Sequence, residues 1–572
     1  MENHLTSSRY KLLAITLCLI LLRAHVSTSS AVVDRGRGKW RLLLHNTGVV
    51  AMHMTLTHHN TVIILDHTGS GPSAYQLRGR SNGPLCQVTQ TADPSCYAHS
   101  VEYNVAQNKI RPLDIRTDTW SSSGSMMSNG TLVQTGGFGS GSRKIRYFEP
   151  CGDGKCDWRE PTRSFLADER WYSSSLRLPE KDDQVIVLGG RNAFSYEFVP
   201  KSTSREEKFF ELPFLRKTWE KKEGGNNLYP FLHLSSDGHL FVFANRDSIL
   251  FNYKRNTIVK HFPRIPGKGS RSHPSGGSSV ILPLGHEDGF RKVEVMICGG
   301  AADRAFEAAS RDRFLKGSSS CGRMVITGHH HNWKMENMPE PRLMNDMIIL
   351  PTGHLLIING AKNGSAGLNS ASDPSTQPYL YKPKKSRGKR FSVLKGTKIA
   401  RMYHSSAVLL PDGRVLVAGS NPNERYIYRN VPHPTELRLQ AFTPTHMEKK
   451  FDNKRPHNVS VYYTNGTTNR SAAYGEEFEV EFGVRRSKEK MRVKDLVFTA
   501  YAPPFNTHSL SMNQRMLRLK CNSVERSSKN GGWRAVLEVP KSPNVAPAGY
   551  YMLSVVRNGI PSEAQWVRFM HA

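Results

Sequence analysis

Acidic residues are scarce in this sequence of 572 residues. It contains 48 Asp and Glu but 79 Lys and Arg, which gives a formal net charge of +31. An excess of this size predicts an acidic partner. Long apolar runs are missing beyond the first residues, so no later transmembrane helix is expected. Hydrophobic residues still make up 38% of the chain, which excludes a disordered protein and allows sizeable cores.

Several familiar catalytic motifs are absent as well. The sequence has no glycine-rich loop ending in Gly-Lys-Ser/Thr, no His-Glu-x-x-His and no Cys-x-x-Cys. The patterns of P-loop nucleotide hydrolases, of zincin proteases and of dithiol redox proteins are therefore missing. The cluster His329-His330-His331 has no carboxylate beside it, so a solvated loop is favoured there over a metal site.

The N-terminus has the pattern of a secretory signal. Arg9 and Lys11 precede an apolar run from Leu12 to Leu22, and small residues follow up to Ala31. This run is shorter than the ~20 apolar residues that span a bilayer, so a removed signal peptide over residues 1–31 is favoured over a membrane anchor. The mature protein is therefore predicted to be secreted.

Seven cysteines follow the predicted signal peptide. Disulfides are stable in an oxidising compartment, and cysteines close together in sequence are the natural partners. The short spacings predict Cys86–Cys96, Cys151–Cys156 and Cys298–Cys321. Cys521 is left over and is expected to be a buried free thiol.

Five Asn-x-Ser/Thr sequons predict a glycoprotein, and they lie at Asn129, Asn363, Asn458, Asn465 and Asn469. The last three share one polar segment, which fits an exposed glycosylated loop.

Basic residues gather at positions 384–390 and again over 485–494. For an extracellular protein these clusters predict an acidic polysaccharide or another polyanionic matrix, and no nucleic acid, as the partner. The alternative for either cluster alone is a basic surface that is only solvated.

A short unit recurs along most of the chain. A turn with Asp or Gly leads into four to six apolar residues and then a small pair, often Gly-Gly, about every 50–60 residues. The copies lie at 60–66, 130–137, 184–190, 238–245, 293–300, 353–360 and 413–420. This period is typical of kelch-like blades, and the terminal glycines allow close backbone packing. The repeats predict a seven-bladed β-propeller over residues 40–445, and they disfavour a sandwich with accidental repetition.

The pattern changes near the C-terminus. Short segments alternate apolar and polar residues, as at Phe478–Phe482 and Tyr550–Val556. Such segments separated by turn residues predict an immunoglobulin-like, early-set β-sandwich over residues 450–572. The predicted fold class is therefore all-β.

Two tyrosines and two histidines are the candidates for chemistry. Tyr172 and the pair Tyr403-His404 occupy equivalent places, just ahead of a buried blade strand, and His508 lies in the C-terminal domain. Loops at that place in a blade can converge on the propeller axis. Two phenols and two imidazoles form a mixed oxygen and nitrogen set suited to copper(II). The alternative is that they are core residues whose polar tips are satisfied.

At these residues the sequence resembles the glyoxal oxidase family of galactose-oxidase-like proteins. The resemblance covers nearly all of the mature chain and includes residues 96–103, 116–120, 168–172, 403–413, 508–515 and 547–551. It implies a propeller with an immunoglobulin-like domain and a single copper ion. In this family Tyr172 would be the equatorial tyrosinate that becomes a radical and Tyr403 the axial tyrosine that accepts the substrate proton. His404 and His508 would be the imidazole ligands.

The reaction implied by the resemblance takes an aldehyde hydrate or a primary alcohol with O2 to a more oxidised carbonyl product and hydrogen peroxide. The sequence departs from the family at Ser121, because the residue after Trp120 is a cysteine in the family, joined by a thioether to the radical tyrosine. Serine cannot form that thioether, so the Tyr-Cys cofactor is not expected. Two functions therefore stand: a secreted copper oxidase, or a non-catalytic propeller that binds cell-wall polysaccharide. The retained ligand set favours the oxidase.

Overall fold

The computed structural model describes residues 32–33, 37–77, 96–201, 208–463, 471–485, 491–527 and 531–571. The described chain is almost entirely β-structure. Its α-helices are the short α2 (Pro213–Lys217) and α3 (Ala305–Ala309). No helix in these ranges is long and apolar enough to cross a membrane. The predicted signal peptide, residues 1–31, lies outside the described residues.

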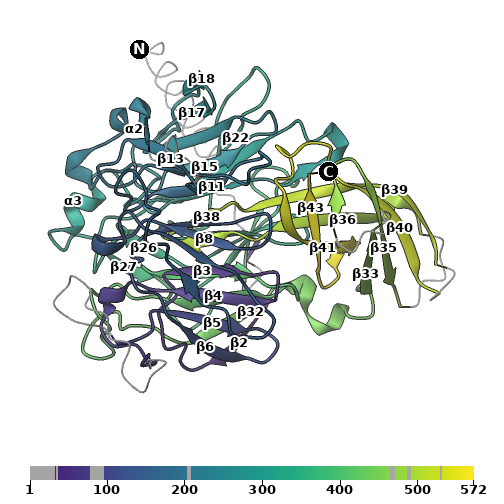
Figure 1. The fold of residues 1–572 in the computed structure, drawn as a ribbon, viewed down its shortest axis with the longest axis horizontal. Coiled ribbons are helices and arrows are strands. Elements are labelled where there is room, and N and C mark those ends of the chain that lie inside the picture. The colour runs from purple at the N-terminus through teal and green to yellow at the C-terminus, as the bar shows by residue number, and fades with distance from the viewer. Residues whose placement is uncertain are drawn as a thin grey trace, which may run out of the picture.

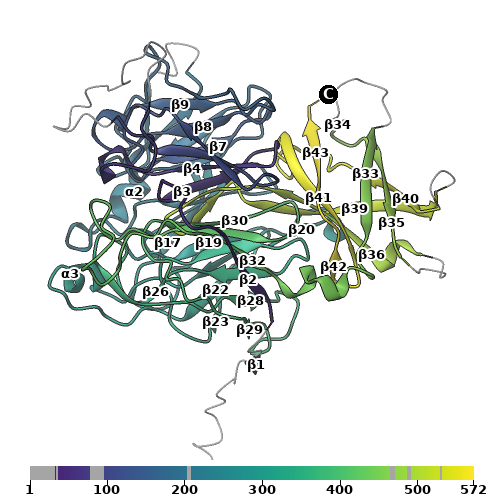
Figure 2. The ribbon, with the colours of Figure 1, turned by 90° about the horizontal axis from the view of Figure 1, so that it is seen from below.

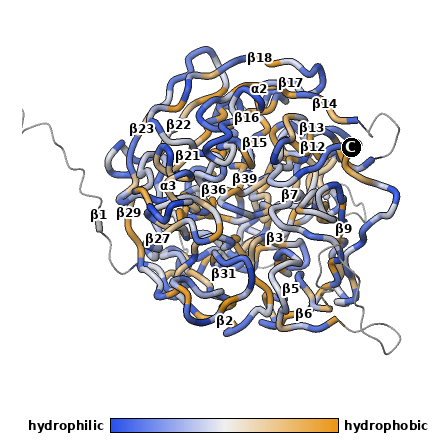
Figure 3. Tube along the Cα trace, turned by 90° about the vertical axis from the view of Figure 1, so that its left-hand side faces the viewer, coloured by the Kyte–Doolittle hydropathy of each residue, from blue (hydrophilic) through white to orange (hydrophobic). Residues whose placement is uncertain are grey.

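Seven sheets of the described chain stand around a common centre as propeller blades (Figures 1 and 3). Blade 1 contains β3 (His53–Leu56), β4 (Thr61–Leu65), β5 (Ser100–Asn104) and β6 (Lys109–Leu113). Blade 2 contains β7 (Ser123–Met126), β8 (Leu132–Thr135), β9 (Ile145–Phe148) and β10 (Trp158–Arg159). Blade 3 contains β11 (Ser174–Arg177), β12 (Val185–Leu188), β13 (Ser195–Val199) and β14 (Phe210–Glu211).

The remaining blades complete the ring. Blade 4 contains β15 (Phe231–Leu234), β16 (Leu240–Ala244), β17 (Asp247–Asn252) and β18 (Thr257–His261). Blade 5 contains β19 (Ser278–Ile281), β21 (Glu294–Cys298), β22 (Ser320–Val325) and β23 (Lys334–Asn337). Blade 6 contains β24 (Asp346–Ile349), β25 (Leu355–Ile358), β28 (Tyr379–Tyr381), β29 (Phe391–Val393) and β1 (Val32–Val33). Blade 7 contains β30 (Ser405–Leu409), β31 (Val415–Gly419), β32 (Leu439–Thr443) and β2 (Lys39–Leu44).

The seven-bladed propeller predicted from the repeats is confirmed. Each repeat is the second strand of a blade, and these strands are almost wholly buried because neighbouring blades cover both faces. The innermost strands did not stand out in the sequence. They share no common pattern: β7, β11, β19 and β30 carry serine, as in Ser174-Ser175-Leu176-Arg177, whereas β3, β15 and β24 carry none.

The ring is closed by the N-terminal strand. β2 adds to the outer edge of blade 7, with Trp40 opposite Phe442 on β32. The two ring centroids are 5.1 Å apart, and the indole Nε1–H of Trp40 donates to the carbonyl of Lys395. This pairing joins an early and a late strand of the chain in one blade, with β2 as the outermost strand of blade 7.

A C-terminal sandwich packs beside the propeller, as the yellow and green strands of Figures 1 and 2 show. Its strands are β33 (His457–Tyr463), β34 (Ala472–Ala473), β35 (Glu477–Gly483), β36 (Leu496–Ala502), β39 (Arg515–Arg526), β40 (Trp533–Glu538), β41 (Gly549–Arg557), β42 (Ile560–Pro561) and β43 (Gln565–Met570). The long β39 pairs with β36 in its first half and with β40 in its second half, and it shifts register between Cys521 and Ser523. β39 also pairs with the short β20 (Leu284–Gly285) of the propeller.

One hairpin leaves the sandwich and enters the propeller. β37 (Phe505–Thr507) and β38 (Leu510–Met512) join the sheet of blade 1, where β37 pairs with β3. β37 also contacts β7 and β30, and β38 contacts β11, β19 and β24, so the hairpin stands among the innermost strands of six blades. Its two-residue tip, His508 and Ser509, has φ values of 44° and 73°, as tight hairpin turns require.

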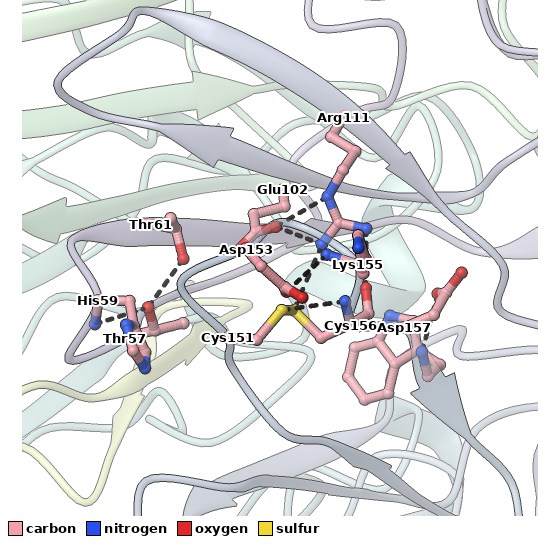
Figure 4. The surroundings of a disulfide bond; sticks show 11 residues. Thr57, His59, Thr61, Glu102, Arg111, Cys151, Asp153, Lys155, Cys156 and Asp157 are labelled. Carbon is pink, nitrogen blue, oxygen red and sulfur yellow. Dashed lines mark hydrogen bonds and ion pairs between the residues drawn. A yellow bond between two sulfur atoms is a disulfide. The ribbon is translucent and has the colours of Figure 1, made fainter.

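Two of the predicted disulfides are present, Cys151–Cys156 and Cys298–Cys321. Around the first, Arg111 of β6 donates to the carbonyl of Cys156 at 2.7 Å and pairs with Glu102 (Figure 4). Cys96 is disulfide-bonded, and its predicted partner Cys86 lies outside the described residues. The register shift in β39 leaves the free thiol of Cys521 half-buried, which corrects the expectation of a buried one.

The sequons have different settings. Asn129 and Asn458 are exposed and Asn363 is half-buried, whereas Asn465 and Asn469 lie outside the described residues. Glycosylation of the chain stays a prediction.

The β37–β38 hairpin packs closely against a glycine of blade 2. A Cβ added to Gly124 of β7 would lie 2.7 Å from the ring of Phe505 on β37. We expect Gly124→Ala to lower the free energy of unfolding by about 1–3 kcal/mol, the usual cost of overpacking. Chemical denaturation of Gly124→Ala, Phe505→Leu and the double variant measures the coupling. Fully additive losses would contradict this contact.

Candidate metal centre

In four blades a buried arginine, called the anchor below, lies in the loop that precedes the innermost strand. In each, an arginine guanidinium donates to a backbone carbonyl at the C-terminal end of the second strand of its own blade. The pairs are Arg170 with Gly189, Arg271 with Gly299, Arg342 with Asn359 and Arg401 with Gly419. A buried guanidinium has several N–H groups to satisfy, so the loop is held in one position.

Two residues after each of two anchors stands a tyrosine that faces the axis, Tyr172 after Arg170 and Tyr403 after Arg401. These loops precede β11 and β30, the innermost strands, and not the Gly-Gly strands as the sequence suggested. Tyr172 and His404 adopt left-handed φ values of 65° and 62°, and Ser121 one of 51°. Side chains larger than glycine avoid this region, and such strain is concentrated at functional sites.

The structure brings the predicted site residues into one group. The hydroxyl oxygens of Tyr172 and Tyr403 are 3.2 Å apart. The ring of His508 lies edge-on to those of Tyr403 and His404, at centroid distances of 5.2 and 5.0 Å. All four side chains are between 1% and 6% exposed. Three segments that are far apart in the chain, two blade loops and the hairpin tip, therefore meet on the axis.

The two histidines are held as neutral bases. Burial lowers the pKa of His404 and of His508 well below the ordinary value, and neighbouring histidines add to the effect. Neither ring nitrogen of His404 has a hydrogen-bond partner, although the ring is buried. Buried polar atoms are nearly always paired, so these free nitrogens call for a ligand. The alternative that His404 is a core residue with satisfied polar tips is wrong.

The residues fit a copper ion by their chemistry. Imidazole nitrogen suits copper, and a mixed nitrogen and oxygen set is typical of copper(II). The described residues contain no group of three or more His, Cys, Asp or Glu that could hold a metal, so the phenols are needed to complete a set of four donors. Nδ1 of His508 lies 2.6 Å from the hydroxyl of Thr507, which orients the ring and leaves Nε2 facing the group.

Ser121 lies at the centre of this group. Its hydroxyl is 3.3 Å from Nε2 of His508, and its carbonyl accepts a hydrogen bond from the backbone N–H of Tyr172 at 2.9 Å. The side chain is fully buried. Ser121 therefore lies beside the backbone of Tyr172 and the imidazole of His508.

Several neighbours of Tyr172 are not among the residues predicted from the sequence. His273 stacks on its ring at 4.6 Å with an interplanar angle of 22°, and Trp171 packs against it at 4.9 Å. Tyr229 meets it edge-on at 5.4 Å. Burial lowers the pKa of His273 to about 3, so this ring is neutral. The order Arg271-Ser-His273 repeats that of Arg170-Trp-Tyr172, and this spacing was the available signal.

A propeller that receives a C-terminal hairpin on its axis, with two phenols and two imidazoles around the tip, defines a galactose-oxidase-like protein. Residues 52–446 match the family model "Glyoxal oxidase N-terminus", and residues 455–569 match "Galactose oxidase-like, Early set domain". The chain belongs to the glyoxal oxidase family. The resemblance drawn from the motifs is thereby confirmed.

Named relatives agree with this assignment. The chain is 41% identical over 537 residues to "Aldehyde oxidase GLOX" of Vitis pseudoreticulata, covering 93% of this chain and 97% of that protein. It is 40% identical over 541 residues to "Aldehyde oxidase GLOX1" of Arabidopsis thaliana, covering 93% and 85%. A fungal AA5 alcohol oxidase solved in complex with copper has the same fold, with a TM-score of 0.68 and 16% identity over 94% of this chain and 100% of that one.

The anchor of Tyr172 is testable. Arg170 forms a fully buried ion pair with Glu197 at 2.7 Å. Burial raises the pKa of Glu197, but Arg170 and Lys201 outweigh it and hold this pKa below the ordinary value. The pair therefore stabilises the fold at neutral pH, and its contribution is lost as the pH falls through that lowered pKa. We expect Arg170→Met to cost about 3–5 kcal/mol at pH 7 and less in acid, by denaturation.

The matched control is the exposed pair of Arg116 and Asp114, 3.3 Å apart. Arg116→Met should cost less than about 1 kcal/mol at any pH. Equal losses in the two variants would show that the buried anchor has no special role.

Proposed function

We propose that this chain is a secreted copper-radical oxidase that takes aldehydes or primary alcohols and O2 to oxidised carbonyl products and H2O2. The observation that carries the proposal is the buried group of Tyr172, Tyr403, His404 and His508, in which His404 keeps two unpartnered nitrogens. Membership of a family with relatives named aldehyde oxidases supports it. The signal pattern of residues 1–31 supports secretion.

In this proposal Tyr172, Tyr403, His404 and His508 hold a single copper ion. Copper bound there would supply a Lewis acid and an acceptor for one electron. The chain supplies the rest: the phenolate Oη of Tyr403 takes the proton of the substrate hydroxyl, and the Tyr172 radical takes the hydrogen atom from the substrate carbon. Two electrons and two protons leave the substrate, and O2 receives them to give H2O2.

The surroundings of Tyr172 suit a persistent radical. His273 and Trp171 pack on its ring and Tyr229 meets its edge, so water is kept from the ring. In relatives with the cysteine, the thioether sulfur would donate electron density to this ring. Ser121 provides no such substituent, so we propose that the radical of this chain forms less readily and turns over slowly.

A non-catalytic role is the second candidate. Ser121 is the observation that favours it, because a site without the thioether could be kept only for binding. In this alternative the propeller holds an acidic cell-wall polysaccharide such as pectin through its excess of positive charge. The complete donor set of the buried group favours the oxidase.

Copper binding is the first test. We expect one copper per chain by metal analysis, with a copper(II) electron paramagnetic resonance signal. His404→Ala and His508→Ala should each lose at least tenfold in copper affinity. A direct ligand contributes at least as much affinity as the residues that orient it, and loss of those costs about 10–100-fold. His233→Ala is the matched control, since His233 is also a buried histidine whose pKa burial lowers to about 3, but it lies in blade 4. Equal copper content in all four proteins would refute the assignment.

The missing thioether is the second test. We expect Ser121→Cys, loaded with copper and exposed to O2, to lose the mass of two hydrogens as the bond to Tyr172 forms, and to raise the rate of peroxide release. Ser122→Cys is the control, because the hydroxyl of Ser122 faces His53 at 3.1 Å. A full-length protein with copper bound but with unchanged mass and rate would favour the non-catalytic role.

A further inference from the structure

Two adjoining clefts lie between blade 6 and the C-terminal sandwich. The first encloses about 850 Å³ and the second about 1000 Å³. They share a stretch of wall formed by Thr352, His354 and Lys382 of blade 6 with Asn558 and Gly559 of the sandwich. Together they form one continuous depression, which is called the basic groove below. Figure 2 shows β28 and β29 on one side of this region and β36 and β42 on the other.

The lining of the basic groove is strongly positive. The first cleft has five Lys or Arg among its described lining residues and no Asp or Glu, and the second has seven Lys or Arg and three Asp or Glu. Lys382 belongs to both. Each carboxylate of the second cleft has a partner in the protein: Glu294 pairs with Arg323, Asp495 with Arg492, and Asp288 accepts from the backbone of Lys292. Arg323 and Lys292 lie beside Glu294, and Arg518 pairs with Glu287. The excess positive charge of the second cleft therefore comes from Lys382, Lys384, Lys385 and Lys494.

The groove joins the two basic clusters of the sequence, which are about a hundred residues apart. Lys384 and Lys385 come from the turn between β28 and β29, at the start of the first cluster. Arg485 and Lys494 come from the sandwich and mark the ends of the second. Only the tertiary fold places these charges on one surface, which distinguishes a built site from a generally basic exterior.

Local electrostatics agree with this geometry. Burial and the neighbouring Lys382 lower the pKa of His354 to about 4, so its ring is neutral at the floor of the groove. Burial and Arg518 also lower the pKa of Lys384. The positive charges near His354 and Lys384 thus disfavour protonation of these two side chains, as expected where cations are close together and no anion is bound.

The groove is remote from the metal centre. It opens at the turn between β24 and β25, where Thr352 and His354 lie. The loops that carry the metal-centre residues stand at the other end of the innermost strands, where Tyr172 precedes β11 and His404 precedes β30. A ligand in the groove therefore leaves the metal centre accessible.

We propose that the basic groove binds a linear polyuronate, a polysaccharide with one carboxylate on each sugar unit. The inference deepens the proposed function and rests on its secreted location. The elongated double cleft fits an extended chain rather than a flat membrane surface. Phe451 is the single Phe, Tyr or Trp among the described lining residues, whereas single-stranded nucleic acid is bound on platforms of several aromatic rings. The groove thus holds the protein on its polymer while the metal centre faces away.

The test is binding of a long oligogalacturonate, measured by calorimetry. The groove variant carries Lys382→Glu, Lys454→Glu and Arg485→Glu, and the control variant carries Lys109→Glu, Lys221→Glu and Lys222→Glu, which changes the same charge at exposed positions elsewhere. We expect wild-type binding that weakens between about 0.05 and 0.5 M NaCl. We also expect a loss of about tenfold or more in the groove variant and less than about twofold in the control.

Each other outcome overturns the proposal. Equal losses in the two variants would mean diffuse attraction, and groove-dependent binding of phosphatidylserine vesicles or single-stranded RNA without oligogalacturonate would name another ligand. If the groove variant fails to fold, lysine acylation of the wild type decides. Oligogalacturonate should protect Lys382, Lys384 and Lys454 but not Lys109 or Lys221, and absence of that protection counts against the groove. Copper-free protein should bind equally well, so a failed oxidase assay leaves this test unaffected.

Discussion

The insertion of the β37–β38 hairpin into the propeller is the constraint on which the site depends. Blade loops can place Tyr172, Tyr403 and His404 on the axis, but the second imidazole, His508, comes from the tip of a hairpin that belongs to the sandwich. β37 pairs with β3 and contacts β7, so it occupies a place that the innermost strands leave for it. The group formed by these four side chains therefore exists only when both domains are folded together.

The energetic design combines rigid supports with strained residues. Buried arginines tie each site loop to the end of a neighbouring strand, and Arg170 also holds Glu197 as a buried ion pair. Against this support, Tyr172 and His404 keep left-handed backbone conformations that cost free energy. His404 adds two unpartnered nitrogens. Strain and unmet polar groups collected in one buried place are the physical mark of a site that is completed by a ligand.

The fold was largely predictable, because the repeated strands are buried on both faces and must be apolar, as in Val185–Leu188. The innermost strands escaped notice because they share no common pattern: β11 is Ser174–Arg177, whereas β15 is Phe231–Leu234 without a serine. The pairing of β2 with β32 could not be foreseen, since it joins segments about 400 residues apart without a local signal. His273 repeats the spacing of Tyr172 after an arginine, yet its stacking on that ring depends on how the blades converge.

The residue types of the four candidate donors, the serine at position 121 and the excess of positive charge could all be read from the sequence. These are properties of residue types, which chemistry fixes before folding. The tertiary structure alone decided that Ser121 lies 3.3 Å from His508, and that two basic clusters line one groove. Such proximities depend on the closure of the ring and on the docking of the sandwich, which bring together segments hundreds of residues apart.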